Sequence, residues 1–402
     1  MPTKPSERQL DEFLTRAVAE VVVRDDLVRL LRSGERRLRI KQGFDPTRPN
    51  LHIGHAISLR KLRTLAEWGH EVVIIVGDWT TQIGDPTDKD ESRPMITHEE
   101  VMANAKTYLD QFHLIVPREN TRIVFQDEWF GKFGLRDVIE LASRFTVQQL
   151  LAREEFRNRQ TAGTPIPVKD ILYPLLQAYD SVAIEADVEV GGTDQLFNLL
   201  GGRQLQEQVG QRPQNVFVTY LLEGLDGEKM SKSKPQTGIW LTDKPSEVFG
   251  KVMAIHDDLM PHWFEWATEM PMSEVHATLD TLRSGELRPR DAKERLARRI
   301  VSEMYSDDAA ETAAEAFVKQ FRDKAGAAET TRRPVKLDGT DVAIADLLVA
   351  LTLVRNKSEA RNLVKAGSVK IDGQVAAAGA RVARGTRPVI ELGRHRVQPD
   401  WE

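Results

Sequence analysis

The sequence predicts an α/β fold with a doubly wound, Rossmann-like parallel sheet, then a helical domain and a small, mildly basic terminal module. The first 76 residues alternate strand, helix and strand patterns. Residues 246–321 have an almost entirely helical pattern. Residues 341–402 carry a net charge of +3, against −8 for the preceding 340 residues. A chain of 402 residues is expected to form two or three domains.

A β-α-β unit is the clearest local pattern. Residues 38–44 read as a strand, 53–68 as a helix that Gly69 ends and Asn50 caps, and 72–76 as a strand buried on both faces. Such units are parallel and bind ligands beyond the carboxyl ends of their strands. The loops at 43–47 and 77–78 are therefore expected at a binding site.

The remaining helices and strands are predicted from the spacing of apolar residues and from residues that interrupt regular structure. Residues 8–33 predict a leading helical segment. Residues 98–160 predict helices with a strand at 122–125, residues 169–180 a helix despite Pro174, and residues 188–190 a strand. The predicted organisation is a catalytic domain at 1–245, a helical domain at 246–330, a linker at 331–340 and a terminal domain at 341–402.

Bulk composition excludes several classes of protein. A net charge of −5 argues against indiscriminate coating of nucleic acid. The absence of cysteine excludes disulfides and thiolate chemistry and fits a reducing cytosol. With no signal peptide and no long apolar run, the expected location is the cytoplasm.

The segment Leu51-His52-Ile53-Gly54-His55 is expected to bind phosphate. His52 and His55 lie three residues apart on one helical face near a helix start, where backbone N–H groups already favour anions. Gly54 leaves room for a flat base against the backbone. A pair of surface histidines or half of a metal site remain alternatives, but no H-E-x-x-H pattern follows, and no resident metal is expected.

A second segment, Lys229-Met230-Ser231-Lys232-Ser233, is expected to form an exposed loop whose lysines reach a polyphosphate. Taken alone, such a loop is more often simply solvated. The chain has neither a P-loop nor a dinucleotide fingerprint, so phosphate binding is left to these groups.

The two segments, in this order on a doubly wound α/β unit, resemble the signatures of class I aminoacyl-tRNA synthetases. Other segments narrow the resemblance to the bacterial tyrosyl-tRNA synthetase family, over nearly the whole chain. These segments are residues 43–47, 83–86, 173–180 and 191–195.

The resemblance implies that ATP is a substrate and carries Mg²⁺ with it. Its residues near the phosphates would be His52, His55, Lys229, Lys232 and Thr47, with Gly54, Gly192, Asp194, Ser233, Lys89 and Arg93 completing the ATP site. For the amino acid the resemblance implies Asp85, Tyr173 and Gln177 around the ammonium, Gln195 near the carboxylate and Asp180 at the phenolic hydroxyl. Tyr173, Gln177 and Asp180 share one helical face.

Lys41 departs from the family pattern, because many members have a tyrosine there that contacts the substrate hydroxyl. A charged lysine cannot accept a hydrogen bond, although it could pair with Asp180 or point elsewhere. We therefore leave Lys41 out of the predicted tyrosine site, and our hypothesis is that Asp180 alone recognises the hydroxyl.

The tail from Ile344 to Gly373 resembles the small α+β RNA-binding domain shared with ribosomal small-subunit protein four. Its expected basic face, which would contact phosphates of tRNA(Tyr), consists of Arg355, Lys357, Arg361 and Lys365. The resemblance also implies that the helical domain at 246–330 binds the tRNA anticodon. It implies a homodimer as well, for which Phe130, Phe133, Val138 and Phe145 are candidate interface residues.

Three alternatives compete with the implied activation of tyrosine and its transfer to tRNA. A tryptophanyl enzyme shares the scaffold, but Asp180 and the basic terminal module argue against it. Another adenylate-forming ligase would have no use for that module. A synthetase-derived RNA-binding regulator would not need His52, His55, Lys229 and Lys232.

Overall fold

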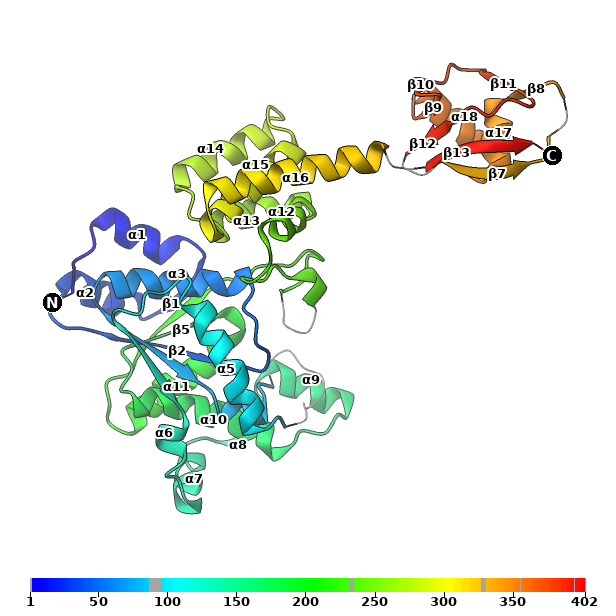
Figure 1. Cartoon of the computed structure of the whole chain (residues 1–402). Coiled ribbons are helices and arrows are strands. Elements are labelled where there is room, and N and C mark those ends of the chain that lie inside the picture. The colour runs from blue at the N-terminus through cyan, green and yellow to red at the C-terminus, as the bar shows by residue number, and fades with distance from the viewer. Residues whose placement is uncertain are drawn as a thin grey trace. The chain divides into compact units, whose positions relative to one another are not determined.

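The computed structural model describes residues 2–86, 95–230, 235–326, 330–337, 339–354, 356–393 and 395–401 (Figure 1). The chain divides into two compact units, Met1–Ala314 and Glu315–Glu402. Each unit has its own hydrophobic core.

A six-stranded sheet organises the first unit. Its strand order is β1-β6-β5-β2-β3-β4, and every neighbouring pair is parallel except β1 with β6. The strands are β1 Val18–Val22, β2 Arg39–Phe44, β3 Glu71–Val76, β4 Thr121–Phe125, β5 Val188–Gly192 and β6 Asn215–Thr219. After β2 the chain winds to β3 and β4 and then returns to β5 on the other side of β2. The order therefore reverses at β2 and β5, where sheets of this type bind ligands.

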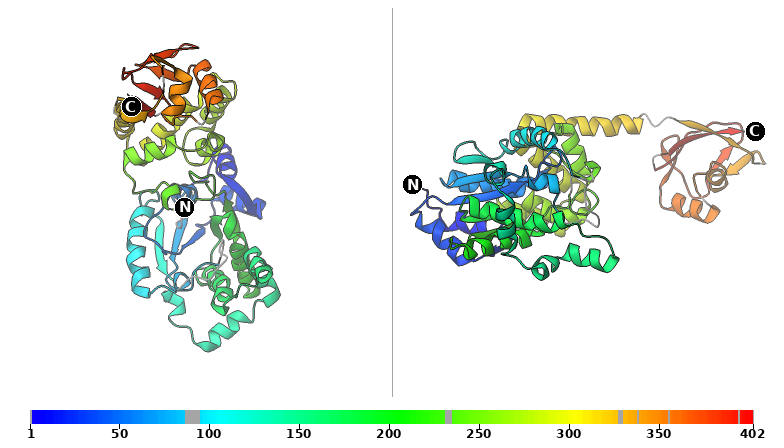
Figure 2. Two further views of the ribbon diagram at one scale, coloured as in Figure 1. Left: turned by 90° about the vertical axis from the view of Figure 1, so that its right-hand side faces the viewer. Right: turned by 90° about the horizontal axis from the view of Figure 1, so that it is seen from below.

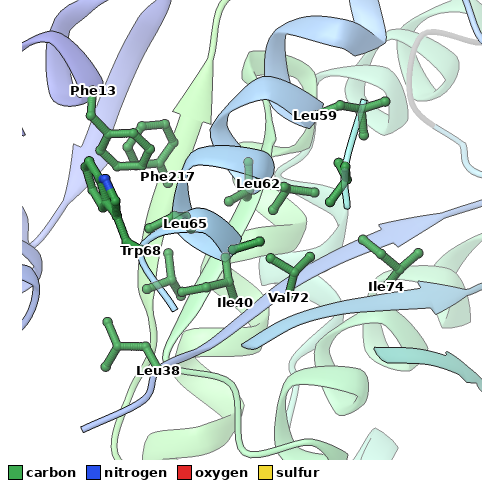
Figure 3. Close-up of a cluster of buried hydrophobic side chains, with 14 of the residues drawn as sticks. Phe13, Leu38, Ile40, Leu59, Leu62, Leu65, Trp68, Val72, Ile74 and Phe217 are labelled. Carbon is green, nitrogen blue, oxygen red and sulfur yellow. The ribbon is translucent and has the colours of Figure 1, made fainter. Parts of the chain in front are cut away.

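Helices cover both faces of this sheet (Figure 1, Figure 2). Val72 and Ile74 of β3 pack with Leu62 of helix α3, Ile53–Glu67, in the main core shown in Figure 3. The alternate residues Val73 and Ile75 pack in a second cluster. Because neighbouring side chains of a strand point to opposite faces, β3 is buried on both sides, as its apolar run predicts.

Most of the remaining helices of the first unit lie within the predicted helical stretches, including α10, which continues through Pro174, whereas α4 and α11 were not predicted. They are α1 Glu7–Thr15, α2 Arg24–Ser33, α4 Thr80–Ile83, α5 His98–Phe112, α6 Asp127–Phe130, α7 Leu135–Ala142, α8 Val147–Leu151, α9 Glu154–Ala162, α10 Val168–Ala183, α11 Leu196–Gln208, α12 Pro245–Met253, α13 Met260–Trp266, α14 Met272–Arg283 and α15 Pro289–Met304. Helix α16, Asp307–Gly326, crosses the boundary between the two units.

The predicted helical segment at 8–33 is wrong in its middle. Ala17 and Val23 have positive φ angles, 55° and 62°, which interrupt the helix, and the valine-rich residues between them form β1. Pairing with β6 supplies hydrogen bonds that an isolated helix would have satisfied locally. The N-cap of α3 is His52 and not Asn50, so that prediction is also corrected.

The second unit is a small α+β domain. Its five-stranded sheet has the order β10-β9-β12-β13-β7, and β8 pairs separately with β11. The elements are β7 Thr331–Val335, β8 Asp341–Ala343, α17 Ile344–Ala350, α18 Lys357–Lys365, β9 Val369–Ile371, β10 Gln374–Val375, β11 Arg381–Ala383, β12 Ile390–Leu392 and β13 His395–Trp401.

The predicted linker at 331–340 needs correction in its first half. Thr331–Val335 is strand β7, which pairs in parallel with β13, and Val335 is buried in the core of the domain. Because this strand contains two arginines and a proline, its sequence lacks the apolar pattern that predicts a strand. Across the described residues, we find no helix with the length and apolar character needed to cross a membrane.

Candidate active site

One cavity of about 550 Å³ opens at the carboxyl end of the parallel sheet. It brings together every predicted ATP-site and tyrosine-site residue that the structure describes. These residues are Thr47, His52, Gly54, His55, Asp85, Tyr173, Gln177, Asp180, Gly192, Asp194, Gln195 and Lys229. The predicted residues Lys89, Arg93, Lys232, Ser233 and Arg355 lie outside the described residues.

The two histidines lie at the start of helix α3. The backbone N–H of His52 donates to Nδ1 of His55 at 3.2 Å, and their ring centroids are 3.8 Å apart. A Cβ on Gly54 would lie 2.9 Å from Nδ1 of His52, so only glycine fits there without a shift. The helix start therefore presents imidazoles and backbone N–H groups together, an arrangement suited to phosphate.

Backbone hydrogen bonds connect the histidine segment to the chain that follows the lysine segment. Ile53 N–H donates to the Ile239 carbonyl at 2.8 Å, and Leu241 N–H donates to the Leu51 carbonyl at 2.9 Å. These bonds join residues almost 190 positions apart in the sequence. Lys229, at the described start of the lysine segment, lines the same cavity as the two histidines.

Lys229 lies at this cavity and contacts Asp194. Its Nζ is 2.8 Å from Oδ2 of Asp194, and both side chains are partly exposed. Gly192 leaves the backbone close to this carboxylate, because a Cβ there would lie 2.7 Å from Oδ1 of Asp194. A carboxylate beside bare backbone can bind ribose hydroxyls, and the lysine can turn to a phosphate.

A chain of polar side chains occupies the other end of the cavity. Gln195 Nε2 donates to Oδ2 of Asp85 at 2.8 Å, and Tyr173 Oη donates to Oδ2 of Asp45 at 2.8 Å. Gln177 also lines this end. Two carboxylates with amide and hydroxyl groups can surround an ammonium group, as the sequence prediction requires.

Asp180 is almost fully buried and accepts hydrogen bonds from two side chains of the segment after β4. Gln126 Nε2 lies 2.9 Å from Oδ2, and Trp129 Nε1 lies 3.2 Å from Oδ1. Burial raises the pKa of Asp180 to about 7, although the charge of Lys41 and the Gln126 hydrogen bond favour the ionised form. The charge of this carboxyl, and with it its strength as a hydrogen-bond acceptor, therefore depends on the groups around it.

Asp45, Gln126 and Trp129 are missing from the predicted site. Asp45 lies in the 43–47 loop at the end of β2, and Gln126 directly follows β4, so position after a parallel strand was an available signal. No comparable signal in the sequence marks Trp129.

Lys41 does not form an ion pair with Asp180. Its Nζ lies 2.8 Å from Oε1 of Glu189, the residue beside it on β5, and both side chains are buried. Of the two possibilities that the sequence left open, the structure therefore favours a partner other than Asp180.

No group of three or more potential metal ligands occurs among the described residues. The acidic groups of the cavity are instead engaged with Gln195, Tyr173, Lys229, Gln126 and Trp129.

A Rossmann-like sheet whose carboxyl edge carries paired histidines, Lys229 and a polar pocket is the arrangement expected of a class I synthetase catalytic unit. The family model for class I tRNA synthetases (W and Y) matches residues 33–322, and the S4 domain model matches residues 344–387. The chain is 47% identical over 371 residues to a tyrosine–tRNA ligase of Dehalococcoides mccartyi strain CBDB1, covering 92% of this chain and 93% of that one. It is 43% identical over 379 residues to the tyrosine–tRNA ligase of Carboxydothermus hydrogenoformans, covering 92% of each. The chain therefore belongs to the tyrosine–tRNA ligase family of class I aminoacyl-tRNA synthetases.

Solved structures agree on the fold. A C-terminally truncated mitochondrial tyrosyl-tRNA synthetase of Aspergillus nidulans matches with a TM-score of 0.62 and 24% identity, covering 78% of this chain and 94% of that one. A tyrosyl-tRNA synthetase of Archaeoglobus fulgidus matches with a TM-score of 0.61 and 22% identity, covering 76% and 99%.

Proposed function

We propose that this protein activates L-tyrosine with ATP to form tyrosyl-adenylate and transfers the tyrosine to the 3′ end of tRNA(Tyr). The observation that carries the proposal is the cavity that brings the histidines, Lys229, Asp194 and Asp180 together. A nucleotide and an amino acid can meet there with no further rearrangement of the sheet.

In the first step the tyrosine carboxylate attacks the α-phosphorus of ATP, and pyrophosphate leaves. His52, His55, Lys229 and Lys232 bind the phosphates, with Thr47 beside the reacting phosphate and Ser233 completing the loop. Negative charge grows on the phosphate oxygens, so these donors bind the transition state more tightly than the ground state. Mg²⁺ accompanies ATP as its counter-ion, and the protein contributes position and charge without a covalent intermediate.

The remaining roles divide between the ends of the cavity. Gly54 gives the adenine room, Gly192 and Asp194 bind the ribose, and Lys89 and Arg93 belong to a second basic loop at the phosphates. Asp85, Tyr173, Gln177 and Gln195 hold the ammonium and carboxylate of the amino acid. Asp180 accepts a hydrogen bond from the phenolic hydroxyl, while Gln126 and Trp129 fix its orientation.

ATP–pyrophosphate exchange with tyrosine, phenylalanine and tryptophan in parallel tests this function. We expect exchange with tyrosine and very little with the other two, because only tyrosine pairs with the buried Asp180. Exchange with tryptophan instead would favour the tryptophanyl alternative, and no exchange with any of the three would refute the proposal.

The S4 domain contributes a basic face for tRNA. Lys357, Arg361 and Lys365 are exposed on α18, and Ala360 and Val364 on the same helix are buried in the core. We propose that this face contacts phosphates, together with Arg355.

Replacing Lys357, Arg361 or Lys365 by Ala should weaken tRNA binding without affecting amino-acid activation. Each lost phosphate contact should reduce the slope of log affinity against log salt by about 1. Filter binding at several salt concentrations and pyrophosphate exchange are the two measurements, with Lys4→Ala as a surface control. Equal salt slopes for all four variants and the parent would exclude this face.

Of the four candidate interface residues, Val138 is exposed, whereas the three phenylalanines are buried or half-buried. Phe130 is buried at 3% exposure, and Phe133 and Phe145 pack against the cluster around Leu141. The apolar residues exposed on α7 are Leu135, Val138 and Ile139, which lie on one helical face. We propose this face as the dimer interface.

Leu135→Glu combined with Ile139→Glu should convert the dimer to a monomer, because two charges would be buried in an apolar contact. Sedimentation velocity measures the change. Leu114→Glu, at a residue that is also highly exposed but lies outside α7, should leave the dimer intact. A double variant with the sedimentation coefficient of the parent would place the interface elsewhere.

A further inference from the structure

Lys41 and Glu189 form an ion pair below the floor of the cavity. Both side chains are almost completely excluded from solvent, and they lie on neighbouring parallel strands in direct register. Glu189 lines the cavity, whereas Lys41 does not. Glu189 also accepts hydrogen bonds from Ser181 Oγ, at 3.1 Å, and from Gln214 Nε2.

The same ammonium group holds helix α10. Lys41 Nζ donates to the backbone carbonyl of Gln177 at 3.1 Å and to Ser181 Oγ at 2.9 Å. These two residues flank Asp180 on the helix, and Gln177 and Asp180 both face the cavity. One side chain from β2 therefore fixes the turn of α10 that carries the proposed hydroxyl acceptor.

We propose that Lys41 is a positioning residue for tyrosine recognition: held by Glu189, its ammonium anchors α10 from below and keeps the Asp180 carboxyl in its charged, accepting form. The proposal rests on the proposed contact between Asp180 and the substrate hydroxyl. A buried ion pair is seldom retained for stability alone, because well-packed apolar residues of similar volume usually serve as well. The Lys41–Glu189 pair lies at the floor of the substrate pocket, so its presence is better explained by the effect of the Lys41 charge on Asp180.

Among the residues that the structure describes, three charged groups act on Asp180 from the surrounding elements. Lys41 of β2 lowers its pKa, whereas Glu189 of β5 and Asp45 after β2 raise it, and burial leaves the pKa at about 7. The carboxyl is thus ionised above about pH 7 and loses its charge as the pH falls. Loss of the Lys41 charge would move that change to higher pH.

The test compares the ratio of kcat/KM for tyrosine to kcat/KM for phenylalanine across pH 5.5 to 9, in pyrophosphate exchange. Groups that act equally on both substrates cancel in this ratio, so it reports on the hydroxyl contact. In the unaltered enzyme we expect the ratio to fall about tenfold as the pH drops through about 7. In Lys41→Met the midpoint should move up by about one pH unit or more, with KM for ATP unchanged.

Lys41→Met leaves the Glu189 carboxylate buried without its lysine partner, and the single variant could therefore fail to fold. The double variant Lys41→Met with Glu189→Gln removes this buried charge and keeps the test possible in that case. The pH midpoint of the substrate ratio in the double variant should lie between those of the parent and of Lys41→Met. The reason is that the charge of Lys41 shifts the pKa of Asp180 more than the charge of Glu189 does. The matched control is Lys61→Met, another buried lysine, whose Nζ donates to the Phe13 carbonyl. Its midpoint should equal that of the parent.

A folded Lys41→Met or double variant with the midpoint of the parent would overturn the proposal, as would an equal shift in Lys61→Met. Asp180→Asn separates this result from failure of the proposed function. If that variant loses the preference for tyrosine while the Lys41 midpoints do not move, only the role of Lys41 is refuted. If it keeps the preference, the hydroxyl contact itself is wrong.

Discussion

Replacing Asp180 by Asn should reduce kcat/KM for tyrosine about 100-fold, while kcat/KM for phenylalanine stays within a few-fold of the parent. A hydrogen bond to a charged, buried acceptor contributes about 1.5 to 3 kcal/mol, which corresponds to about 10- to 150-fold. The amide of Asn cannot replace the Asp180 carboxylate, because Gln126 Nε2 approaches both carboxylate oxygens and Trp129 Nε1 approaches one of them. Asn offers a single oxygen, and its NH₂ group would face one of these donors.

Steady-state pyrophosphate exchange with both amino acids measures the effect. The control is Asp110→Asn on the exposed side of α5, which should leave both substrates unaffected. Phenylalanine serves as the internal reference, since it lacks the hydroxyl. An Asp180→Asn enzyme that still prefers tyrosine as strongly as the parent would remove Asp180 from the recognition of the hydroxyl.

Replacing His55 by Ala should lower kcat for adenylate formation about 100-fold or more, with KM for tyrosine nearly unchanged. Removal of one donor aimed at developing charge typically has this magnitude. The effect should appear in kcat, because the phosphate charge that the imidazole meets grows only toward the transition state. Single-turnover formation of tyrosyl-adenylate is the direct measurement.

His55 also has a structural task, since it accepts the His52 backbone N–H in a reciprocal cap. His55→Glu separates the two tasks, because a glutamate at this position can keep the cap while its charge repels phosphate. We expect His55→Glu to unfold at nearly the temperature of the parent and to be even less active than His55→Ala. His98→Ala on the surface is the control. Near-normal kcat in His55→Glu would mean that the histidine only caps the helix.

Prediction from the sequence succeeded best where the signal was local. The β-α-β unit of β2, α3 and β3 follows from periodicity and a glycine stop, and the short histidine segment lies at a helix start, as predicted. The leading segment failed because β1 is stabilised by β6, almost 200 residues later, and not by its own propensity. The linker failed for the same reason, since β7 depends on its partner β13.

The candidate site divides in a similar way. The Tyr173, Gln177 and Asp180 face was visible from helical spacing, and all three side chains line the cavity. The contacts of Gln126 and Trp129 with Asp180 could not be predicted, because each pair is more than 50 positions apart in the sequence. The burial of Phe130, one of the candidate interface residues, was missed for a related reason. Burial of Phe130 depends on packing against Phe133 and Tyr179, which no local pattern reveals.

The sequence by itself determined most of the alternation of strands and helices, the place of the histidine segment at the start of α3, and the charge of each part of the chain. These features depend on residues close together in the chain, where spacing fixes which side chains share a face. The tertiary structure alone decided that Ile53 of the histidine segment bonds to Ile239, that Lys41 pairs with Glu189, and that Asp180 is buried and bonded to Gln126 and Trp129. Such contacts form only when distant strands meet, and burial then sets the charge that each group carries.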